Sequence, residues 1–356
     1  MKSLRILIAA ALGFALLPPA PAQEGKPAPP ARGVVLFIGD GLGLSLIAAT
    51  RAHAVGVEGR LEMEKLPHTA RVHTRSANAA ITDSAAGASA YASGFKVPNR
   101  SINVCEDGSR PPLISTLARK AGKGVGIVTN THLTDATPAA FYGWSDQRQD
   151  EGSLALQLAS ADFQVVLGGG SAWLTSMGMA GSQRKNGRDV LAEARAKGWR
   201  VISRAADLAG VRDDCEGMRW LGIFASGDLS YVDERDGHPN QPSLTEMTLA
   251  ALRRLQQEKE GFFLIVEGGM IDKACHKKWD ARAIQETLEF DRTIGEVVKS
   301  VDDRTLVIVT ADHETANGSH TAEDVFGAAK GPGSEEVRGV LDNTELFGIM
   351  RRALGL

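Results

Sequence analysis

The chain has 356 residues, 43% of them hydrophobic and 23% charged, which is typical of globular proteins and excludes disordered or fibrous ones. Its 40 Lys and Arg are balanced by 43 Asp and Glu, so the formal net charge is −3. This charge excludes the strongly basic surface through which many proteins bind nucleic acid.

The first 22 residues have the features of a secretory signal peptide. Lys2 and Arg5 precede an apolar run at 6–17, and an Ala-Pro-Ala sequence at 20–22 forms a small-x-small cleavage site. The run is shorter than the about 20 residues that span a bilayer, which argues against an uncleaved membrane anchor. We therefore expect an exported protein, periplasmic or secreted, that is not embedded in a membrane.

The rest of the chain is expected to form one domain behind a short tether. Residues 23–32 contain three prolines and should form a flexible mature N-terminus. Residues 33–356 contain no internal repeat, low-complexity tract or interdomain linker. We therefore expect a single domain over 33–356.

Short apolar runs alternate with helical patterns along this domain. The runs are too continuous for half-exposed strands, and they predict strands that are buried on both faces. The predicted strands are 34–38, 125–129, 164–167, 221–224, 262–266 and 305–310, and the predicted helices are 84–93, 113–121, 152–159, 188–197, 243–257, 281–300 and 344–353. Ser243 and Glu246 suggest a capping box. The alternation favours an α/β fold with a doubly wound, mostly parallel sheet.

Acidic residues follow four of the predicted strands. They are Asp40, Asp135, Glu267 with the nearby Asp272, and Asp312. In open α/β sheets, ligands bind outside the carboxyl ends of the strands. A single acid there would be interpreted as a helix cap or a solvated loop residue. Five carboxylates in one crevice would repel one another, and bound cations are the natural compensation.

Histidines accompany two of these acidic positions. Asp272 and His276 are four residues apart, which places them on one face of a helical turn. His313 directly follows Asp312, and His320 comes seven residues later. Carboxylate oxygens together with imidazole nitrogens are suitable ligands for zinc.

The remaining candidate ligands offer only oxygen. Asp135, Thr137 and Glu267 suit magnesium, which is a harder ion than zinc. His132 lies near Asp135 but has no recognisable partner, and we assign it no function. The other histidines have no such neighbours and are interpreted as packed or solvated residues: His53, His68, His73 and His238.

Ser84 is the candidate nucleophile. It lies in the sequence TDSAAGA at 82–88, at the start of a predicted helix rich in Ala and Gly. A helix N-terminus attracts anions, and small residues allow the backbone to approach a phosphate closely. An isolated serine is a weak nucleophile, which metal coordination can activate. Taken alone, Ser84 or Asp83 would be interpreted as an ordinary helix cap.

The chain contains three cysteines, Cys105, Cys215 and Cys275. Export would permit a disulfide bond. If one forms, we expect it between Cys105 and Cys215, because Cys275 lies between two candidate zinc ligands. The sequence leaves open whether that bond exists, and one thiol must remain free.

In combination, these stretches resemble the alkaline phosphatases, which are zinc- and magnesium-dependent phosphomonoesterases. The matching stretches follow the family's order: VLFIGDG at 35–41, TDSAAG at 82–87, DATPAA at 135–140, FFLIVEGGMIDKACH at 262–276, TLVIVTADHE at 305–314 and HT at 320–321. The resemblance implies a three-layer sandwich with a large, mostly parallel central sheet flanked by helices. It also implies hydrolysis of phosphate monoesters to alcohol and inorganic phosphate at alkaline pH.

The resemblance also implies a role for each candidate residue, with two Zn²⁺ and one Mg²⁺ as cofactors. Ser84 matches the serine that is transiently phosphorylated. The implied ligands are Asp272, His276 and His320 for one zinc, Asp40, Asp312 and His313 for the second zinc, and Asp40, Thr137 and Glu267 for magnesium, with Asp135 near that ion. Arg148, eleven residues after Thr137, matches the phosphate-binding arginine, and Lys273 matches a lysine near the phosphate.

Two departures from the family pattern bear on these expectations. Only six residues, 314–319, separate His313 from His320, so a tight turn must return His320 to its zinc. The large insert through which several relatives dimerise is missing, which weakens the expectation of a homodimer.

Cys275 should point away from the face of Asp272 and His276, and we expect it to pack rather than bind zinc.

Three alternative functions remain. A sulfatase of the same superfamily would carry a Cys/Ser-x-Pro-x-Arg segment, which differs from DSAA at 83–86. A phosphodiesterase would generally lack the third metal, whose expected ligands Thr137 and Glu267 are present. A phosphate- or zinc-binding protein without catalysis would need no Ser84.

Overall fold

The computed structural model of the chain describes residues 30–209 and 217–356. The expected signal peptide, most of the expected tether and Cys215 lie outside the described residues. Cys105 and Cys275 are free thiols in the described part of the chain. Across the described ranges, no helix combines the length and apolar character needed to cross a bilayer.

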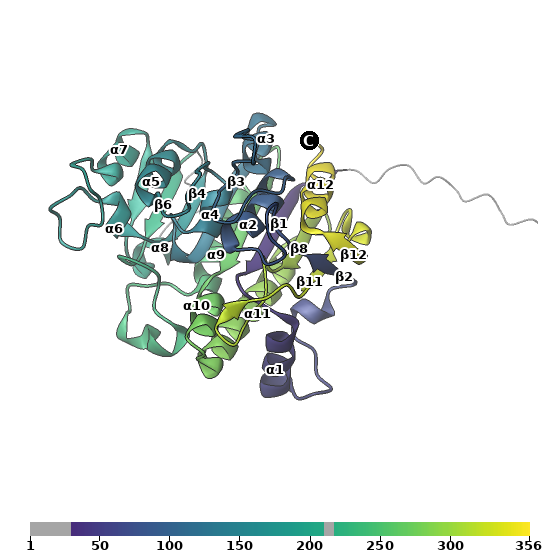
Figure 1. Cartoon of the computed structure of the whole chain (residues 1–356). Helices are drawn as coiled ribbons and strands as arrows, with labels where there is room; N and C mark the ends of the chain where they lie inside the picture. Colours follow the sequence, from purple (N-terminus) through teal and green to yellow (C-terminus); the bar gives the residue numbers. More distant parts are fainter. Residues whose placement is uncertain (1–29, 210–216) are drawn as a thin grey trace, which may run out of the picture.

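A ten-stranded sheet runs through the centre of the molecule (Figure 1). Its order is β12-β2-β11-β8-β1-β7-β3-β4-β6-β5, and of these strands only β11 runs antiparallel to its neighbours. The strands are β1 Gly33–Gly39, β2 His68–His73, β3 Gly124–His132, β4 Val165–Gly169, β5 Trp199–Ile202, β6 Arg219–Ile223, β7 Phe262–Gly268, β8 Thr305–Thr310, β11 Val325–Lys330 and β12 Gly339–Asp342. The expected mostly parallel sheet is confirmed.

The six predicted strands are all present. They lie next to one another in the sheet, in the order β8-β1-β7-β3-β4-β6. The sequence patterns missed β2, β5, β11 and β12, which lie in the outer parts of the sheet. In β2, exposed and buried residues alternate, and half of the residues of β12 are exposed. Strands β2 and β12 therefore lack the continuous apolar run by which doubly buried strands are recognised.

The seven predicted helices are also present, with nearly the predicted bounds. The α-helices are α1 Leu44–Val55, α2 Ser84–Ser93, α3 Ile114–Lys120, α4 Ala136–Ala140, α5 Glu151–Ser160, α6 Ser171–Leu174, α7 Val190–Ala196, α8 Ala205–Ala209, α9 Leu244–Leu255, α10 Met270–His276, α11 Asp280–Ser300 and α12 Asn343–Ala353, and the 3₁₀ helices are η1 Met63–Lys65, η2 Val232–Gly237 and η3 Ser334–Glu336. The predicted capping box at Ser243 and Glu246 begins α9. Most of the missed helices are too short to show a period.

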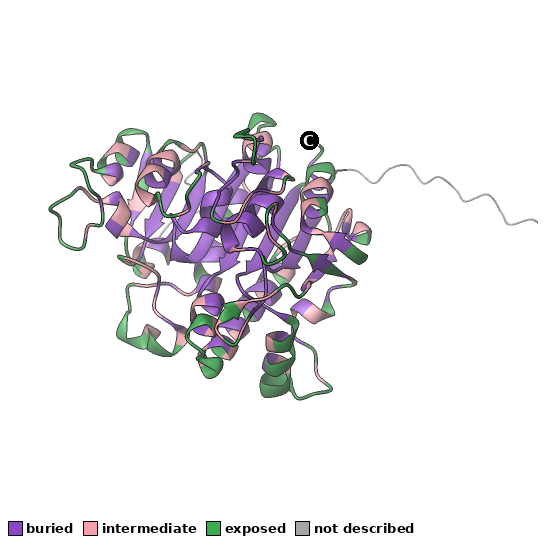
Figure 2. Cartoon of the chain, viewed as in Figure 1, coloured by how far each residue is buried: buried purple, intermediate pink, exposed green. Residues whose placement is uncertain are grey.

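Helices cover both faces of the sheet, so the architecture is a three-layer sandwich. Helices α3, α4 and α12 each pack against α2 on one face, whereas α1, α9 and α10 each pack against α11 on the other (Figure 1). The strands between these layers are buried, and exposed residues are concentrated on the outer helices and loops (Figure 2). This arrangement explains why the central strands are apolar on both faces.

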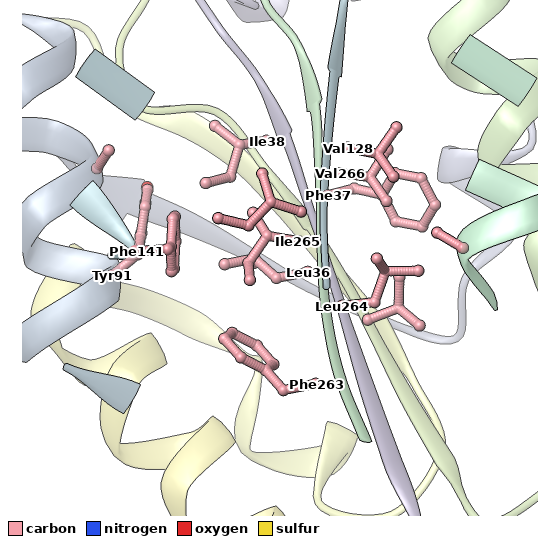
Figure 3. Packing of buried hydrophobic residues seen from close by; sticks show 14 of the residues in the cluster. Leu36, Phe37, Ile38, Tyr91, Val128, Phe141, Phe263, Leu264, Ile265 and Val266 are labelled. Atoms are coloured by element: carbon pink, nitrogen blue, oxygen red, sulfur yellow. The ribbon is translucent and has the colours of Figure 1, made fainter. Parts of the chain in front are cut away.

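The core alternates from one face of the sheet to the other. In β1, Leu36 and Ile38 point towards the face that carries Tyr91 and Phe141, and Phe37 points to the opposite face (Figure 3). The matched residues of β7 alternate in the same way, because β1 and β7 pair in parallel register. The resulting rigid centre of the sheet carries the candidate site at its carboxyl edge.

Candidate active site

The candidate site lies at the carboxyl ends of four adjacent strands, β8, β1, β7 and β3. In the register of the sheet, Ile38 pairs with Glu267 on one side and with Thr310 on the other. Asp40 and Asp312 each follow these paired positions by two residues, so the parallel register itself brings three acids to one edge. The prediction that the acids gather there is confirmed for these strands.

Asp40, Asp312 and His313 form a fully buried cluster. The Nε2 atom of His313 lies 3.4 Å from Oδ1 of Asp40 and 3.4 Å from Oδ2 of Asp312. Gly41 donates its backbone N–H to Oδ1 of Asp312 over 3.2 Å. Gly41 has a φ of 71°, and a Cβ there would lie 2.7 Å from Asp272 Oδ1, so only glycine fits this turn.

Ser84 is the first residue of α2 and lies against this cluster. Its Oγ is 3.2 Å from Nε2 of His313. Asp83 caps the helix by accepting a hydrogen bond from the N–H of Ala86 over 3.1 Å. The helix approaches closely because it is built from small residues, and a Cβ at Gly87 would lie 2.8 Å from the carbonyl oxygen of Asp312.

A second cluster contains Asp272, His276 and His320. Helix α10 places Oδ2 of Asp272 3.2 Å from Nε2 of His276, which confirms the predicted helical turn. The Nε2 atoms of His276 and His320 are 3.1 Å apart, and Nε2 of His320 lies 3.9 Å from Oδ1 of Asp272. The ring of His313 stacks on His320 at 3.6 Å, so the two clusters are continuous.

A two-stranded hairpin returns His320 to this cluster. Strands β9 Thr315–Ala316 and β10 Ser319–His320 pair Thr315 with His320. The two residues between them, Asn317 and Gly318, have φ angles of 52° and 84°. Two positive φ angles are characteristic of the type I′ turn, for which Asn-Gly is the preferred sequence. This is the tight turn that the short spacing requires.

A third group of oxygen donors surrounds Glu267 at the end of β7. The hydroxyl of Thr131 donates to Oε2 of Glu267 over 3.1 Å, and Thr129 donates to the same atom. The other carboxylate oxygen, Oε1, has no hydrogen-bond partner in the described chain, and neither has the hydroxyl of the buried Thr137. Unpaired buried oxygen atoms at this position fit a hard cation such as Mg²⁺.

The electrostatics of the three groups point to missing positive charge. Burial, together with Asp312 and the other nearby carboxylates, raises the pKa of Asp40 well above its usual value. Burial likewise raises the pKa of Glu267 to about 7 and that of Asp312 to about 8. Asp40 Oδ1 and Asp312 Oδ2 also have no hydrogen-bond partner among the described residues. Bound cations would compensate the repulsion between the buried carboxylates, and they would also satisfy the carboxylate oxygens that lack a partner.

His313 is suited to hold such a cation. Burial, followed by the effect of His320, lowers the pKa of His313 to about 3. The imidazole is therefore neutral at physiological pH and has a free lone pair, which is the form that binds metals. The donor set of carboxylate oxygens and imidazole nitrogens fits zinc in both clusters.

Arg148 and Lys273 form the cationic side of the site. Both contact Asp135: Arg148 Nη2 lies 3.1 Å from Oδ1, and Lys273 Nζ lies 2.8 Å from Oδ2. Arg148 also donates to Asp83 Oδ2 over 3.2 Å, which fixes its guanidinium beside the N-terminus of α2. Burial opposes ionisation of Asp135, but Lys273, His132 and Arg148 together lower its pKa well below the usual value.

Sequence reasoning missed several residues that support the site. Thr315 donates to Oδ1 of Asp272 over 2.5 Å, and Thr131 holds Glu267. His132, to which the sequence pattern assigns no function, makes a 2.7 Å contact through Nδ1 with Asp228. Thr129 lies beside Glu267 only through the register of β3 with β7, and Asp228 lies in a loop without any motif, so the sequence carried no signal for either.

Cys275 lies outside the candidate metal-binding clusters of the described chain. It packs against both hydrophobic clusters of the core, as predicted. Burial, followed by the charge of Asp272, raises the pKa of its thiol to about 12. The protonated thiol is a poor metal ligand.

Comparison with known proteins decides the family. The family model for alkaline phosphatase matches residues 31–319. The chain belongs to the alkaline phosphatase family. This confirms the resemblance, the fold class and the assignment as a phosphatase. Metal dependence is a property of the family, and the carboxylate and histidine clusters are consistent with it.

Individual relatives cover nearly the whole chain. The chain is 34% identical to streptomycin-6-phosphate phosphatase of Streptomyces griseus, over 98% of this chain and 97% of that protein. It is 31% identical to the alkaline phosphatase of Escherichia coli strain K12, over 92% of this chain and 87% of that enzyme. The first of these relatives is named for a specific substrate, whereas the second carries the general name of the family.

Solved structures of alkaline phosphatases have the same fold. The enzyme of the Antarctic bacterium TAB5 superposes with a TM-score of 0.82 at 27% identity, covering 92% of this chain and 99% of that one. The Thermus thermophilus enzyme superposes with a TM-score of 0.83 at 25% identity, covering 96% of each chain. A variant of the TAB5 enzyme has Mg bound in its M3 site. It superposes with a TM-score of 0.81 at 27% identity, covering 92% of this chain and 98% of that one.

Proposed function

We propose that this alkaline phosphatase hydrolyses phosphate monoesters at alkaline pH through a phosphoserine intermediate on Ser84, assisted by two Zn²⁺ and one Mg²⁺. The observation that carries the proposal is the 3.2 Å contact between Ser84 Oγ and His313 Nε2, inside a cluster of buried carboxylates. A serine in an ordinary helix cap would face solvent or its own backbone instead.

The side chains divide naturally among the three ions. Asp272, His276 and His320 would hold one zinc, and Asp40, Asp312 and His313 would hold the other. Asp40, Thr137 and Glu267 would hold magnesium, with Asp135 beside it. When bound, the zinc ions would make the serine hydroxyl more acidic and stabilise the entering and leaving oxygens as Lewis acids.

The protein's own groups account for binding and transfer of the phosphoryl group. Ser84 Oγ forms a bond to phosphorus while the bond to the ester oxygen breaks, and the released alcohol takes up a proton. Water then attacks the phosphoserine, which regenerates Ser84 and releases inorganic phosphate. The guanidinium of Arg148 can donate two hydrogen bonds to the phosphate, next to the free N–H groups at the start of α2. Two in-line displacements predict retention of configuration at phosphorus.

The deciding experiment measures metal content and activity on one purified sample. We expect zinc and magnesium by elemental analysis, and release of phosphate from an aryl phosphate monoester. Aryl phosphodiester and aryl sulfate assays on the same sample test the two other activities known in the superfamily. Faster turnover of the diester or the sulfate than of the monoester would contradict the proposal, and so would full activity after chelation.

Export remains part of the proposal. It is supported by the charged, apolar and small-residue segments of 1–22. The N-terminal sequence of the mature protein, isolated from its native cell, tests it. A mature chain that still begins at Met1 would contradict export. Size-exclusion chromatography with light scattering distinguishes a monomer from a homodimer.

A further inference from the structure

Helix α10 begins without a cap from its own segment, although it carries three residues of the candidate site. Asp272, Lys273 and His276 lie on this helix, whereas the ligands proposed for the second zinc follow the strands β1 and β8. The N-cap residue of α10 is Gly269, which has no side chain to accept a hydrogen bond. The first N–H groups of a helix have no partner within the helix, so a buried helix start needs an acceptor from elsewhere.

The close approach of α10 to β3 explains why residue 269 is glycine. A Cβ at Gly269 would overlap with Cγ2 of Thr131 in β3. The residues that usually cap helices, Ser, Thr, Asp and Asn, therefore have no room at this position. The acceptor for the start of α10 must come from a distant part of the chain.

Asn130 in β3 supplies this acceptor. Its Oδ1 accepts a hydrogen bond from the N–H of Gly269 over 2.8 Å and another from the N–H of Met270 over 3.1 Å. Asn130 is buried, with 2% of the residue exposed, so bulk water has little access to these N–H groups. A side chain 139 positions earlier in the chain thus performs the function of a helix cap.

Glu286 in α11 orients the amide of Asn130. The Nδ2 atom of Asn130 donates a long hydrogen bond, 3.4 Å, to Oε2 of the buried Glu286. The amide therefore presents its oxygen, and not its nitrogen, to the start of α10. The other carboxylate oxygen, Oε1, accepts from the N–H of Val232 over 2.7 Å, which holds the carboxyl group in place. Because α11 packs against α10, these bonds join both helices to β3 (Figure 1).

The α10 zinc is the ion assigned above to Asp272, His276 and His320. We propose that Asn130, oriented by Glu286, is a positioning residue for this ion. Asn130 acts through the backbone of α10, since none of its side-chain hydrogen bonds within the described chain involves a proposed ligand. The inference rests on the proposed function, because it concerns one of the two proposed zinc ions. Loss of Asn130 should weaken the α10 zinc and leave the second zinc in place.

The first test compares zinc binding by wild type and Asn130→Ala. The variant leaves two buried N–H groups unpaired, so the dissociation constant of the α10 zinc should rise by about tenfold or more. Dialysis against a chelator that leaves both zinc ions on wild type should remove one from the variant, as measured by elemental analysis. The zinc concentration that gives half-maximal activity should rise in parallel, whereas kcat at saturating zinc should return close to the wild-type value.

Asn343→Ala is the matched control. Asn343 is buried at the start of α12, away from the site, and accepts a hydrogen bond from Nζ of Lys96 over 2.6 Å. This variant should melt at lower temperature but keep both zinc ions. The loss of one zinc ion from this control as well would show that any loss of stability releases the ion, and would overturn the positioning role.

A second test exchanges the amide and the carboxyl group and keeps their total charge. Glu286→Gln alone places an N–H donor opposite either Asn130 Nδ2 or the N–H of Val232, so it should weaken the α10 zinc. In Asn130→Asp/Glu286→Gln, the aspartate accepts from α10 and the glutamine donates to the aspartate, so zinc binding should recover. This pair of variants tests the proposal even where Asn130→Ala fails to fold.

The outcomes separate the positioning role from the proposed function. Retention of both zinc ions by Asn130→Ala, or the simultaneous loss of both, would overturn the positioning role while the proposed function stands. A double variant that binds zinc no better than Glu286→Gln would overturn the orienting contact in the same way. A wild-type protein that binds no zinc would instead overturn the proposed function.

Discussion

Nε2 of His313 lies 3.2 Å from Oγ of Ser84, although the two residues are 229 positions apart in the chain. The contact exists because α2 packs across the carboxyl end of β8, with Gly87 against the backbone of Asp312. It joins the candidate nucleophile to the candidate zinc ligands.

Replacing Ser84 with alanine should abolish the phosphoserine and lower kcat by about 10³-fold or more, because the nucleophile is lost while the binding groups remain. Steady-state kinetics and a search for phosphorylated protein by mass spectrometry measure both effects. Ser160→Ala, at the exposed end of α5, is the control and should behave as wild type. Normal turnover by the Ser84 variant would remove this serine from the mechanism.

Replacing Arg148 with lysine should weaken phosphate binding while the positive charge is kept. Lysine cannot present two parallel N–H donors, and it cannot bridge Asp83 and Asp135 as the guanidinium does. We expect kcat/KM to fall by about tenfold or more, and the inhibition constant of inorganic phosphate to rise by a similar factor. Unchanged phosphate inhibition would show that Arg148 only links the two carboxylates.

Replacing Gly318 with alanine should weaken zinc binding through the position of His320. Gly318 has a φ of 84°, and its added Cβ would lie 3.0 Å from the side chain of Lys278 and 3.2 Å from the carbonyl oxygen of His276. Backbone strain alone should destabilise the fold by about 1 kcal/mol. The control is Gly178→Ala, whose φ is 92° and whose Cβ would meet nothing within 4 Å.

Both glycine variants should therefore melt at lower temperature, but only Gly318→Ala should lose zinc during dialysis. Zinc content by elemental analysis separates the two effects. Equal zinc retention in both variants would show that the hairpin tolerates the change and that the turn does not determine the position of His320.

The metal-free protein should become less stable as the pH rises from about 6.5 to about 9. The pKa of Glu267 is raised to about 7, that of Asp312 to about 8 and that of His132 to about 10. In this range the folded chain therefore binds more protons than the unfolded chain, and the free energy of unfolding falls with increasing pH. The lowered pKa of His313, about 3, acts only below this range.

Thermal melting of chelator-treated protein at the two pH values measures this effect. The drop should shrink when zinc and magnesium are added, because the cations compensate the ionised carboxylates and bind more tightly as the ligands lose their protons. A melting temperature of the metal-free protein that rises with pH would contradict the assigned electrostatics. Activity should increase towards alkaline pH for the same reason.

Much of the fold could be predicted from the sequence, because the central strands are apolar on both faces. Runs such as 34–38 and 305–310 have that pattern and were located correctly, and so was the capped helix that begins after Ser243. The outer strand β2 was missed, since alternating exposure resembles a loop or an amphipathic segment when its sheet partners are unknown.

The candidate site, like the fold, could be predicted from the sequence only in part. Which acids and histidines follow strands could be recognised from the sequence, because an acid after a buried run is a local pattern. Which of them meet depends on the folded sheet, since the register of β1 with its neighbours brings Asp40, Glu267 and Asp312 together. The pairing of His132 with Asp228 also depends on a loop whose approach leaves no local signal in the chain.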